Sequence, residues 1–364
     1  MEDIQRDMFC ERNVFRRILP FLLIAIIGIP LPSQGQTSLS PASFAPIGLP
    51  SSRSPSPVFN RYAALPPFTA QQPRRGEWIL VPTLEIGQLM TSLLITSETE
   101  PPEFRSLLDY ETISLELPVS YGLGDAVSLE ADVQIQYVWG GFLDGPIEWF
   151  HELFGFPNAG RQETQDGQVV VDVDTKNGYA LRLDRAALLI SDPVVGIAVR
   201  IVRRTSLDLT GRFIGAVPLG LGGGVAGADL PQLGAGIYAD WRPSRRVSAH
   251  LLLGGVLPLE SLIWTGDRPY PVAQVRASVF LETARGIYLF LDGNFKSSPS
   301  RGFVTEDGRD FFGQPNADIL IGIAISGRRS RERGGFGAFS VQEDPFSHNA
   351  SDVRFIGAGA FRFP

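Results

Sequence analysis

Polar and apolar residues alternate one by one through many stretches of this chain beyond Gly76. The clearest stretch is 128–139, SLEADVQIQYVW, and the same alternation runs through 112–121, 274–282 and 318–325. Because successive side chains of a β-strand point to opposite faces, each stretch predicts a strand with one apolar and one polar face. Each stretch is about ten residues long, the length that a tilted strand needs to cross a bilayer. A soluble sheet would alternate too, so this pattern leaves two fold classes open.

The lengths of the connections decide between these classes. Twelve strands are expected, near 77–95, 109–121, 126–140, 194–203, 206–218, 232–242, 247–258, 271–283, 287–296, 317–327, 336–343 and 352–363. The connections between them are short and long in turn, which is typical of outer-membrane barrels with tight periplasmic turns and long outer loops. The sequence therefore predicts an all-β fold, a closed antiparallel transmembrane β-barrel of about 12 strands over residues 76–364, in the outer membrane of a Gram-negative bacterium.

Aromatic residues gather at the expected strand ends, on the apolar face. They are Trp78, Tyr121, Trp241, Phe361 and Phe363 at periplasmic ends, and Tyr137 and Trp139 at an outer end. Aromatic rings favour the headgroup boundary, so we expect two girdles. The last strand also resembles the terminal aromatic strand that the barrel assembly machinery recognises, although Pro364 follows the final Phe. Expected partners are therefore this machinery during biogenesis, and outer-membrane lipid including lipopolysaccharide.

The N-terminal 35 residues have the features of a secretory signal peptide. Arg12, Arg16 and Arg17 precede an apolar run over 18–30, and small residues follow it. Such a run is short for a membrane span, which needs about 20 residues, so cleavage after export is expected. The alternative is a tilted N-terminal anchor. The only cysteine, Cys10, lies in this segment, so the mature chain would contain none, as suits an oxidising compartment without disulfides.

Residues 36–75 form a linker with eight prolines and seven serines in forty positions. A stretch of this composition buries too little apolar surface to offset its ordering entropy, so we expect a flexible or extended segment. It could remain in the periplasm or thread partway into a barrel, and the sequence favours neither position.

Residues 141–193 are expected to be the longest extracellular loop and to contain a short helix over 147–154. Pro146 suits the first helical turn, and Asp144 or Gly145 could cap it. A helix this apolar at a barrel mouth would rest on the membrane surface or fold into the lumen as a partial plug.

The stretch GGFLDGPIEWFHELFGFPNAGR, residues 140–161, resembles a proteobacterial family known as domain of unknown function number 3187. The motif residues of this loop helix are Asp144, Trp149, His151 and Arg161, and the likeness extends more loosely from about residue 57 to the C-terminus. The resemblance implies an uncharacterised envelope β-barrel and supplies no activity.

Charged residues of polar parity are expected to face the lumen. They are Glu85, Glu116, Glu130, Asp132, Arg200, Asp208, Arg212, Arg276, Glu282, Asp318 and Arg354. Buried charges are tolerated only when wet or paired, so they either line a solute path or form ion pairs that brace a closed barrel. Twelve strands exceed the roughly eight whose own side chains fill a barrel. Small inward residues leave further room for a channel or an inserted loop: Gly234, Gly236, Gly322, Ala324, Ala358 and Ala360.

No residues are assigned as catalytic, cofactor-binding or metal-binding. Glu148 and His151 lie three apart on the helix, but a metal would need another convergent ligand. The glycines at 222, 224 and 227 match a dinucleotide fingerprint, but Pro231 and a strand follow where that fingerprint requires a helix. The formal charge of −7, with no dominant basic patch, gives no reason to expect nucleic acid as a partner.

Three functions stay open. The leading hypothesis is a porin-like barrel for small solutes. The first alternative is a closed structural or interaction barrel that binds lipopolysaccharide or a protein. The second is an envelope lipid hydrolase using His151 and an unnamed serine, although an enzyme is the less favoured reading. The solute and the oligomeric state do not follow from the sequence.

Overall fold

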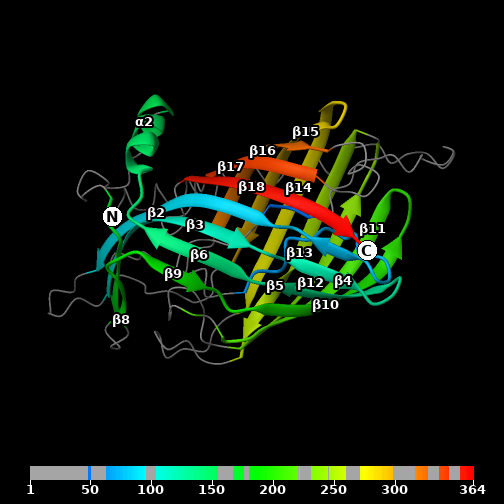
Figure 1. The fold of residues 1–364 in the computed structure, drawn as a ribbon, viewed down its shortest axis with the longest axis horizontal. Helices are drawn as coiled ribbons and strands as arrows, with labels where there is room; N and C mark the ends of the chain where they lie inside the picture. The colour runs from blue at the N-terminus through cyan, green and yellow to red at the C-terminus, as the bar shows by residue number, and fades with distance from the viewer. Residues whose placement is uncertain are drawn as a thin grey trace, which may run out of the picture. The chain divides into compact units, whose positions relative to one another are not determined.

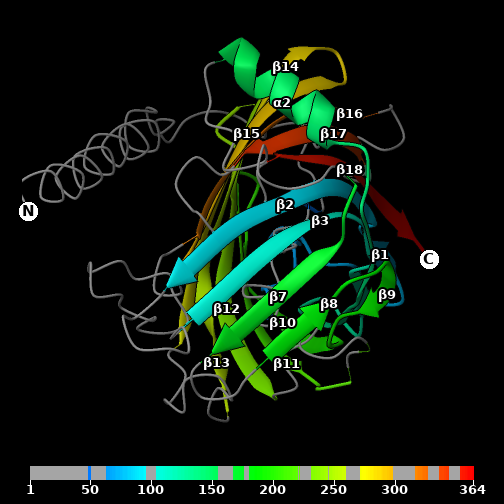
Figure 2. The ribbon, with the colours of Figure 1, turned by 90° about the vertical axis from the view of Figure 1, so that its left-hand side faces the viewer.

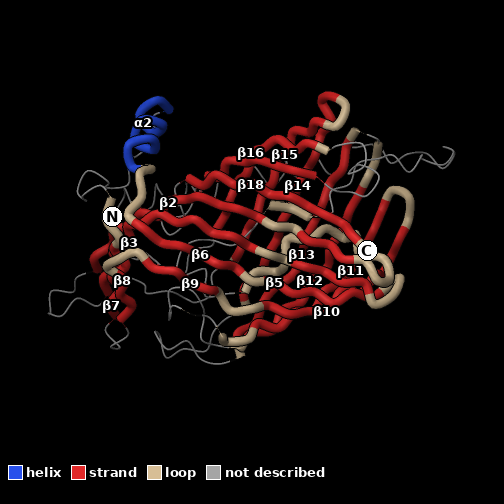
Figure 3. The backbone as a smooth tube through the Cα atoms, in the orientation of Figure 1, coloured by secondary structure: helices blue, strands red, loops and turns tan. Residues whose placement is uncertain are grey.

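The structure, a computed structural model, describes residues 48–50, 63–95, 104–154, 167–175, 180–219, 221, 231–244, 246–259, 271–297, 316–326, 336–343 and 353–364. The strands in these ranges join in a single antiparallel sheet (Figure 3). The expected signal peptide, residues 1–35, lies outside the described residues. No helix among the described residues is long and apolar enough to span a membrane.

The sheet is a ring of twelve strands, of which four are each made of two pieces. These four are β1 (Trp78–Leu80) with β2 (Thr83–Ile95), β3 (Phe104–Glu116) with β4 (Val119–Gly122), β5 (Val127–Asp132) with β6 (Gln134–Trp139), and β9 (Ala187–Ile190) with β10 (Val194–Arg203). The other eight are β11 (Leu207–Ala216), β12 (Gln232–Trp241), β13 (Val247–Pro258), β14 (Val272–Ala284), β15 (Ile287–Lys296), β16 (Asn316–Ile325), β17 (Phe336–Glu343) and β18 (Val353–Phe363).

The last strand closes the ring. β18 pairs with β17 on one side, and on the other side it pairs with both β2 and β1. Ile356 lies opposite Glu85, and Phe361 lies opposite Leu80. The predicted closed antiparallel barrel of about 12 strands is therefore confirmed.

Prolines account for three of the four interruptions in the strands. Pro82, Pro118 and Pro193 separate the two pieces of strands β1/β2, β3/β4 and β9/β10, respectively. Proline has no N–H group, so it cannot donate to a strand ladder. Hydrogen bonds of 3.0 Å from Val81 N to Pro118 O and from Gly359 N to Pro82 O bridge two of these breaks. The wall therefore stays continuous although the ladder is locally interrupted.

The two faces of the wall are opposite in polarity, as the alternation predicts. Large apolar side chains of one parity are exposed, among them Leu84, Ile113, Leu129, Ile197, Leu253, Leu289 and Ile321. The residues between them are buried and mostly polar, among them Glu85, Thr112, Glu130, Arg212, Arg276 and Asp292. An apolar outer surface around a polar interior is the arrangement of a membrane barrel and the reverse of a soluble sandwich.

The two ends of the barrel differ in the lengths of their connections. At one end, called here the short-turn end, the connections are 123–126, 204–206, 242–246, 285–286 and 326–335. At the other, the long-loop end, they are 96–103, 140–186, 217–231, 259–271, 297–315 and 344–352. This is the alternation that the sequence predicts for periplasmic turns and outer loops, with one exception, since 326–335 is longer than 96–103 and 344–352.

Aromatic side chains lie at both ends on the outer face. At the short-turn end the rings of Trp78 and Tyr121 are 4.5 Å apart, and Trp78 lies opposite Phe363. At the long-loop end the rings of Tyr137 and Trp139 stack at 5.9 Å. These positions suit the two headgroup boundaries of a bilayer.

The interval 141–193, expected to be a loop with one short helix, contains that helix and three strands as well. The helix α2 spans Asp144–Phe154. β7 (Val170–Thr175) and β8 (Ala180–Leu183) form a hairpin that pairs with the outer part of β3, and β9 continues into β10. The valines of β7 alternate with Asp172 and Asp174, so the local sequence already carried a strand pattern there.

Candidate functional site

Part of the expected linker lies inside the barrel, within the ring of strands seen in Figure 2. We call residues 48–50 and 63–75 the lumen segment. Leu49, Leu65 and Phe68 are almost fully buried. Of the two positions that the sequence left open for this stretch, these residues take the one inside the lumen.

Hydrogen bonds join the backbone of the lumen segment to side chains of the wall. They run from Ala63 N to Gln232 Oε1 (3.0 Å), Leu65 N to Gln274 Oε1 (3.2 Å), Ala70 N to Asp240 Oδ1 (2.9 Å), Tyr238 OH to Pro66 O (3.1 Å), Arg212 Nη2 to Thr69 O (2.7 Å), Thr210 Oγ1 to Ala70 O (2.7 Å) and Arg276 Nη2 to Pro50 O (2.8 Å). Proline suits such a segment, because it brings no N–H group that would need a partner inside the lumen.

The lumen holds two passes of this chain side by side. Gly48 and Phe68 form an antiparallel bridge, and Leu49 N donates to Pro67 O at 2.7 Å. Neighbouring extended chains lie about 4.8 Å apart, so the two backbones together need a passage roughly 10 Å wide. After residue 75 the chain turns at the short-turn end, where Gly76 N donates to Gly122 O, and enters β1.

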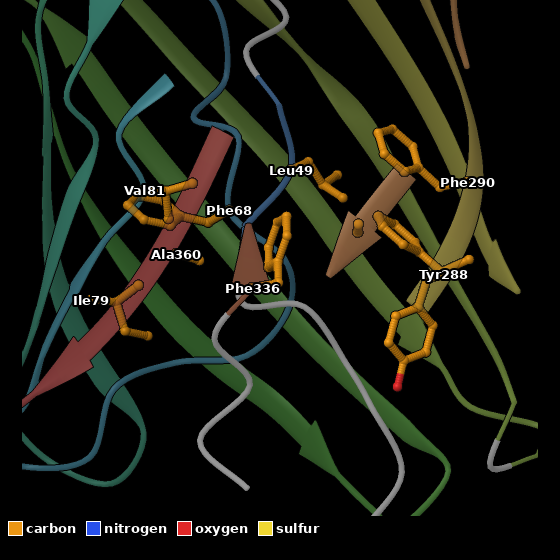
Figure 4. Packing of buried hydrophobic residues seen from close by; sticks show 10 residues of the cluster. Leu49, Phe68, Ile79, Val81, Tyr288, Phe290, Phe336 and Ala360 are labelled. Atoms are coloured by element: carbon orange, nitrogen blue, oxygen red, sulfur yellow. The ribbon is translucent and has the colours of Figure 1, made fainter. Parts of the chain in front are cut away.

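Apolar side chains fix the lumen segment at two places on the wall. Leu49 and Phe68 lie in one cluster (Figure 4), with wall residues Ile79, Val81, Phe280, Tyr288, Phe290, Ala324, Phe336 and Ala360. Leu65 and Ala70 lie in a second cluster, with Val194, Ile214, Ala216, Tyr238, Leu252 and Val256. Burying one such side chain contributes about 1.5–3 kcal/mol, so these contacts favour the closed lumen.

A glycine of β12 makes room for the second of these contacts. A Cβ atom at Gly236 would lie 3.0 Å from Cδ1 of Leu65. Gly236 is one of the small inward residues that the sequence assigned to a channel or an inserted chain, and in the structure the lumen segment occupies this space.

Arg212 connects the wall to the lumen segment. Its Nε lies 3.0 Å from both carboxylate oxygens of Glu130, and its Nη2 donates to Thr69 O. The guanidinium carbon also lies 4.0 Å from the ring centre of Tyr238 and 5.5 Å from that of Phe68, in cation–π geometry. One buried cation therefore neutralises a wall carboxylate and binds the lumen segment.

Arg276 repeats this arrangement on β14. Its Nε donates to Asp292 at 2.9 Å, its Nη2 also contacts Asp292, and the same Nη2 donates to Pro50 O. A third arginine, Arg354, pairs with Glu85 at 3.2 Å and lies 3.7 Å from Asp318. These lumen charges are therefore paired within the described part of the wall.

Asp240 holds a second polar contact with the lumen segment. Its Oδ1 accepts from Ala70 N and lies 2.9 Å from Nδ1 of His250. On the neighbouring strand, Thr210 donates to the carbonyl of the same Ala70. Both backbone groups of Ala70 are thereby satisfied by the wall.

The structure places most of the charged residues assigned to the lumen on the buried, inward-facing rows: Glu85, Glu116, Glu130, Asp132, Asp208, Arg212, Arg276, Asp318 and Arg354. Arg200 and Glu282 lie nearer the short-turn end and are partly exposed. Arg200 contacts the Asp125 carbonyl there, and Glu282 accepts from Gly286 N at 3.1 Å.

Several residues that bind the lumen segment are absent from the sequence-based set. They are Thr210, Gln232, Tyr238, Asp240, Gln274 and the Asp292 partner of Arg276. Each shares the polar parity of its strand, so the alternation also assigns these residues to the lumen.

The loop-helix motif divides between described and undescribed residues. Asp144 starts α2 and accepts from Gln88 Nε2. Trp149 is 64% exposed. The side chain of His151 and all of Arg161 lie outside the described residues, so the hydrolase alternative stays an untested prediction. The described His, Cys, Asp and Glu residues include no group that could hold a metal ion.

The fold and the polar lumen define a β-barrel of the outer-membrane type. A family model described as protein of unknown function (DUF3187) matches residues 47–196, which confirms the resemblance seen in the loop motif region. The matched range includes the lumen segment, α2 and the first seven pieces of the wall, β1 to β6 and β9. No curated protein matches the chain significantly.

Solved structures with a similar fold are outer-membrane barrels. The COG4313 outer membrane channel from Pseudomonas putida F1 has a TM-score of 0.50 and 10% identity, covering 83% of this chain and 98% of that one. The NanC porin has a TM-score of 0.41 and 6% identity, covering 77% and 98%. The toluene transporter TbuX from Ralstonia pickettii has a TM-score of 0.35 and 7% identity, covering 79% and 89%. At 10% identity, the likeness to the Pseudomonas putida channel shows the fold alone.

Proposed function

We propose that this protein is an outer-membrane channel for small solutes, and that its lumen segment closes the path in the resting state. The observation that carries the proposal is that two stretches of this chain, 48–50 and 63–75, lie side by side in the lumen, joined by the bridge between Gly48 and Phe68. Removing them would leave a passage roughly 10 Å across, lined by polar and charged side chains that water can solvate. The name of the similar Pseudomonas putida structure, an outer membrane channel, agrees with this proposal.

The contacts of the lumen segment suit a closure that can be displaced. Most of its described hydrogen bonds to the wall use its backbone atoms, and the Gln72 side chain adds contacts with the backbone of Ala126, Val199 and Arg200. Water or a polar solute can replace each of them. A net hydrogen bond contributes about 0.5–1.5 kcal/mol, whereas Leu49, Leu65 and Phe68 each contribute about 1.5–3 kcal/mol by burial. Burial of these three apolar side chains therefore favours the closed state. The hydrogen bonds determine which residues of the lumen segment lie opposite which residues of the wall.

A specific observation favours the second candidate, a closed structural or interaction barrel. Arg212, Arg276 and Arg354 all form ion pairs with wall carboxylates. Such pairs would brace a barrel that never opens. The two candidates differ in one respect, which is whether the barrel conducts once the lumen segment is removed.

Planar-bilayer recording of two proteins makes this distinction. The mature chain should conduct rarely, and a variant lacking residues 41–72 should conduct persistently. Heat-modifiable migration of both proteins in gels verifies that each barrel is folded. A folded deletion variant that does not conduct would overturn the channel and favour the closed barrel.

A cross-link between the lumen segment and the wall provides the matched control. Leu65→Cys and Gly236→Cys, in a Cys10→Ser background, replace two residues that are in contact. Bridging the thiols should abolish the openings of the full-length chain, and releasing the bridge should restore them.

The proposal includes export and assembly. Residues 1–35 would be cleaved as a signal peptide, which intact-mass measurement of the purified protein tests directly. The assembly machinery would recognise β18 by Phe361 and Phe363. Lipopolysaccharide would surround the outer half of the barrel, and the protein would need no cofactor or metal for transport.

A further inference from the structure

The helix α2 lies against the outside of the barrel wall. Leu143 and Ile147, at its start, are buried against Ile86 and Val341. Both of these wall residues belong to outward-facing rows, since Ile86 pairs with the exposed Ile113 and the neighbours of Val341 are buried and inward. Figures 1 and 2 both show α2 beyond the ring of strands, at the long-loop end. Of the two positions that the sequence allowed, α2 therefore takes the one outside the lumen.

The base of α2 covers two polar groups that would otherwise face lipid. Gln88 and Glu111 lie opposite each other on β2 and β3, with outward parity, and both are almost fully buried. The carboxylate of Glu111 accepts from Leu143 N, and Gln88 donates to Asp144. Gly141 is also fitted to this site, because its φ of 73° is unfavourable for other residues and a Cβ there would meet the Glu111 carboxylate. A charged group on the lipid face is costly, so this cover is what a wall in contact with hydrocarbon requires.

The remaining sides of α2 divide between apolar and acidic residues. Trp149 and Leu153, four residues apart, are 64% and 60% exposed and share one side of the helix. Glu148 and Glu152, also four apart, lie on another side. The helix thus has its first turn against the wall (Figure 1), and its further turns carry one apolar exposed side and one acidic side.

The height of α2 on the wall matches the aromatic girdle. Glu111, which binds the base of the helix, lies opposite Trp139 in the strand ladder. Trp139 stacks with Tyr137, a residue that is 45% exposed on the outer face. The apolar side of α2 therefore continues the lipid-facing surface at the level where hydrocarbon meets headgroups.

We propose that α2 is an interfacial membrane helix, which inserts Trp149 and Leu153 among the acyl chains of the outer leaflet. Phe142, 68% exposed beside the base of the helix, would insert with them. The acidic side faces water, as in other helices that lie in the interface plane. The helix thereby shields Glu111 from hydrocarbon and keeps the start of the long loop away from the mouth of the barrel.

Fluorescence quenching in lipid vesicles tests this proposal. The protein retains Trp149 as its only tryptophan, with the other four replaced by Phe, in phosphatidylcholine vesicles with brominated acyl chains. We expect strong quenching by the brominated lipid and weak quenching by acrylamide in the water. A matched protein that retains only Trp139 reports a side chain of the girdle itself, and its quenching should be similar.

Two outcomes would overturn the proposal. Quenching of Trp149 by acrylamide alone would place α2 in water, and protection from both quenchers would place it against another protein surface. A second measurement does not depend on replacing tryptophans. A nitroxide on Leu153→Cys, in the Cys10→Ser background, should be more accessible to oxygen than to a water-soluble nickel chelate in spin-label saturation. The reverse order would contradict insertion.

Discussion

Arg212 is the wall residue whose loss should most directly release the lumen segment. It binds Thr69 O at 2.7 Å and lies 5.5 Å from the ring of Phe68. Replacing Arg212 alone would also leave Glu130 buried without a partner, at a cost of about 3–5 kcal/mol. The informative variant is therefore Arg212→Met with Glu130→Gln, which removes both charges together and retains most of the volume.

The size of the effect follows from the contacts that the variant loses. A hydrogen bond from a charged donor contributes about 1.5–3 kcal/mol, and a cation–π contact about 0.5–2 kcal/mol. Water partly replaces both contacts in the variant, so the lumen segment should lose about 2–4 kcal/mol of its binding free energy. Since 1.4 kcal/mol corresponds to a factor of ten, the ratio of released to bound segment should rise by roughly 30- to 700-fold.

The labelling rate of a cysteine in the lumen segment measures this ratio. Ala64 is 4% exposed, so Ala64→Cys, with Cys10→Ser, should react with a water-soluble maleimide only when the segment is released. When rebinding is faster than labelling, the rate is proportional to the released fraction. The frequency of openings in planar bilayers should rise in parallel.

A second ion pair, at the short-turn end of β11, provides the control. Arg242 Nη2 lies 2.6 Å from Asp208 of β11 and also donates to Arg204 O, and both arginines lie in the turns that flank β11 and β12. Arg242→Met with Asp208→Asn should leave the labelling rate of Ala64→Cys nearly unchanged. Equal rates in the two double variants would refute the role given to Arg212.

Three further changes test other parts of the structure. Gly236→Val should speed labelling of Ala64→Cys in the lumen segment, because the valine side chain takes the space of Leu65. Adding Leu65→Ala to the same protein should reverse this effect. If the effects of the two substitutions on the labelling rate simply add, the proposed contact is contradicted. Ile321→Lys, at a 65% exposed position in the middle of β16, should lower the free energy of unfolding in vesicles by about 2–4 kcal/mol. Leu123→Lys, at the short-turn end, should lower it by at most about 1 kcal/mol. Equal losses in the two variants would mean that β16 does not face lipid. Glu111→Gln should weaken the hydrogen bond from Leu143 N by about 1 kcal/mol, which should speed hydrogen exchange of that amide roughly fivefold. The amides of β14 should exchange at unchanged rates and serve as the reference.

The wall of the barrel was predictable because its signals are local. Alternation along a strand assigns each side chain to a face, and the alternating lengths of the connections order the strands in a ring. The same parity predicts inward positions for Glu130, Arg212 and Arg276, which the structure confirms. Asp240 and Asp292 have the same parity on β12 and β15, so the alternation alone also predicts their inward positions.

The lumen segment could not be placed in this way, because its contacts carry no sequence pattern. Most of its hydrogen bonds use backbone C=O groups, which every residue has, and backbone N–H groups, which every residue except proline has. They join positions as far apart as Pro50 and Arg276. A Pro/Ser-rich composition also predicts a linker equally well inside or outside a barrel. Similarly, nothing local distinguishes a lipid-facing α2 from a lumenal one, since the deciding contact is between Glu111 and Leu143 across the loop.

The width of the barrel explains why an inserted chain is needed at all. Eight strands are about the number whose own side chains fill the interior, and this ring has twelve. Its inward rows include Gly236 and other small residues, which widen the gap instead of filling it. An empty passage of that width would be a permanently open pore. A core closed by covalent bonds would not conduct at all. A chain segment that is joined to the wall through β1 and otherwise held by noncovalent contacts lies between these two cases. In the proposed channel, burial of Leu49, Leu65 and Phe68 favours the closed path, and hydration of the polar wall favours the open one. The difference between these two free energies then determines how often the path is open.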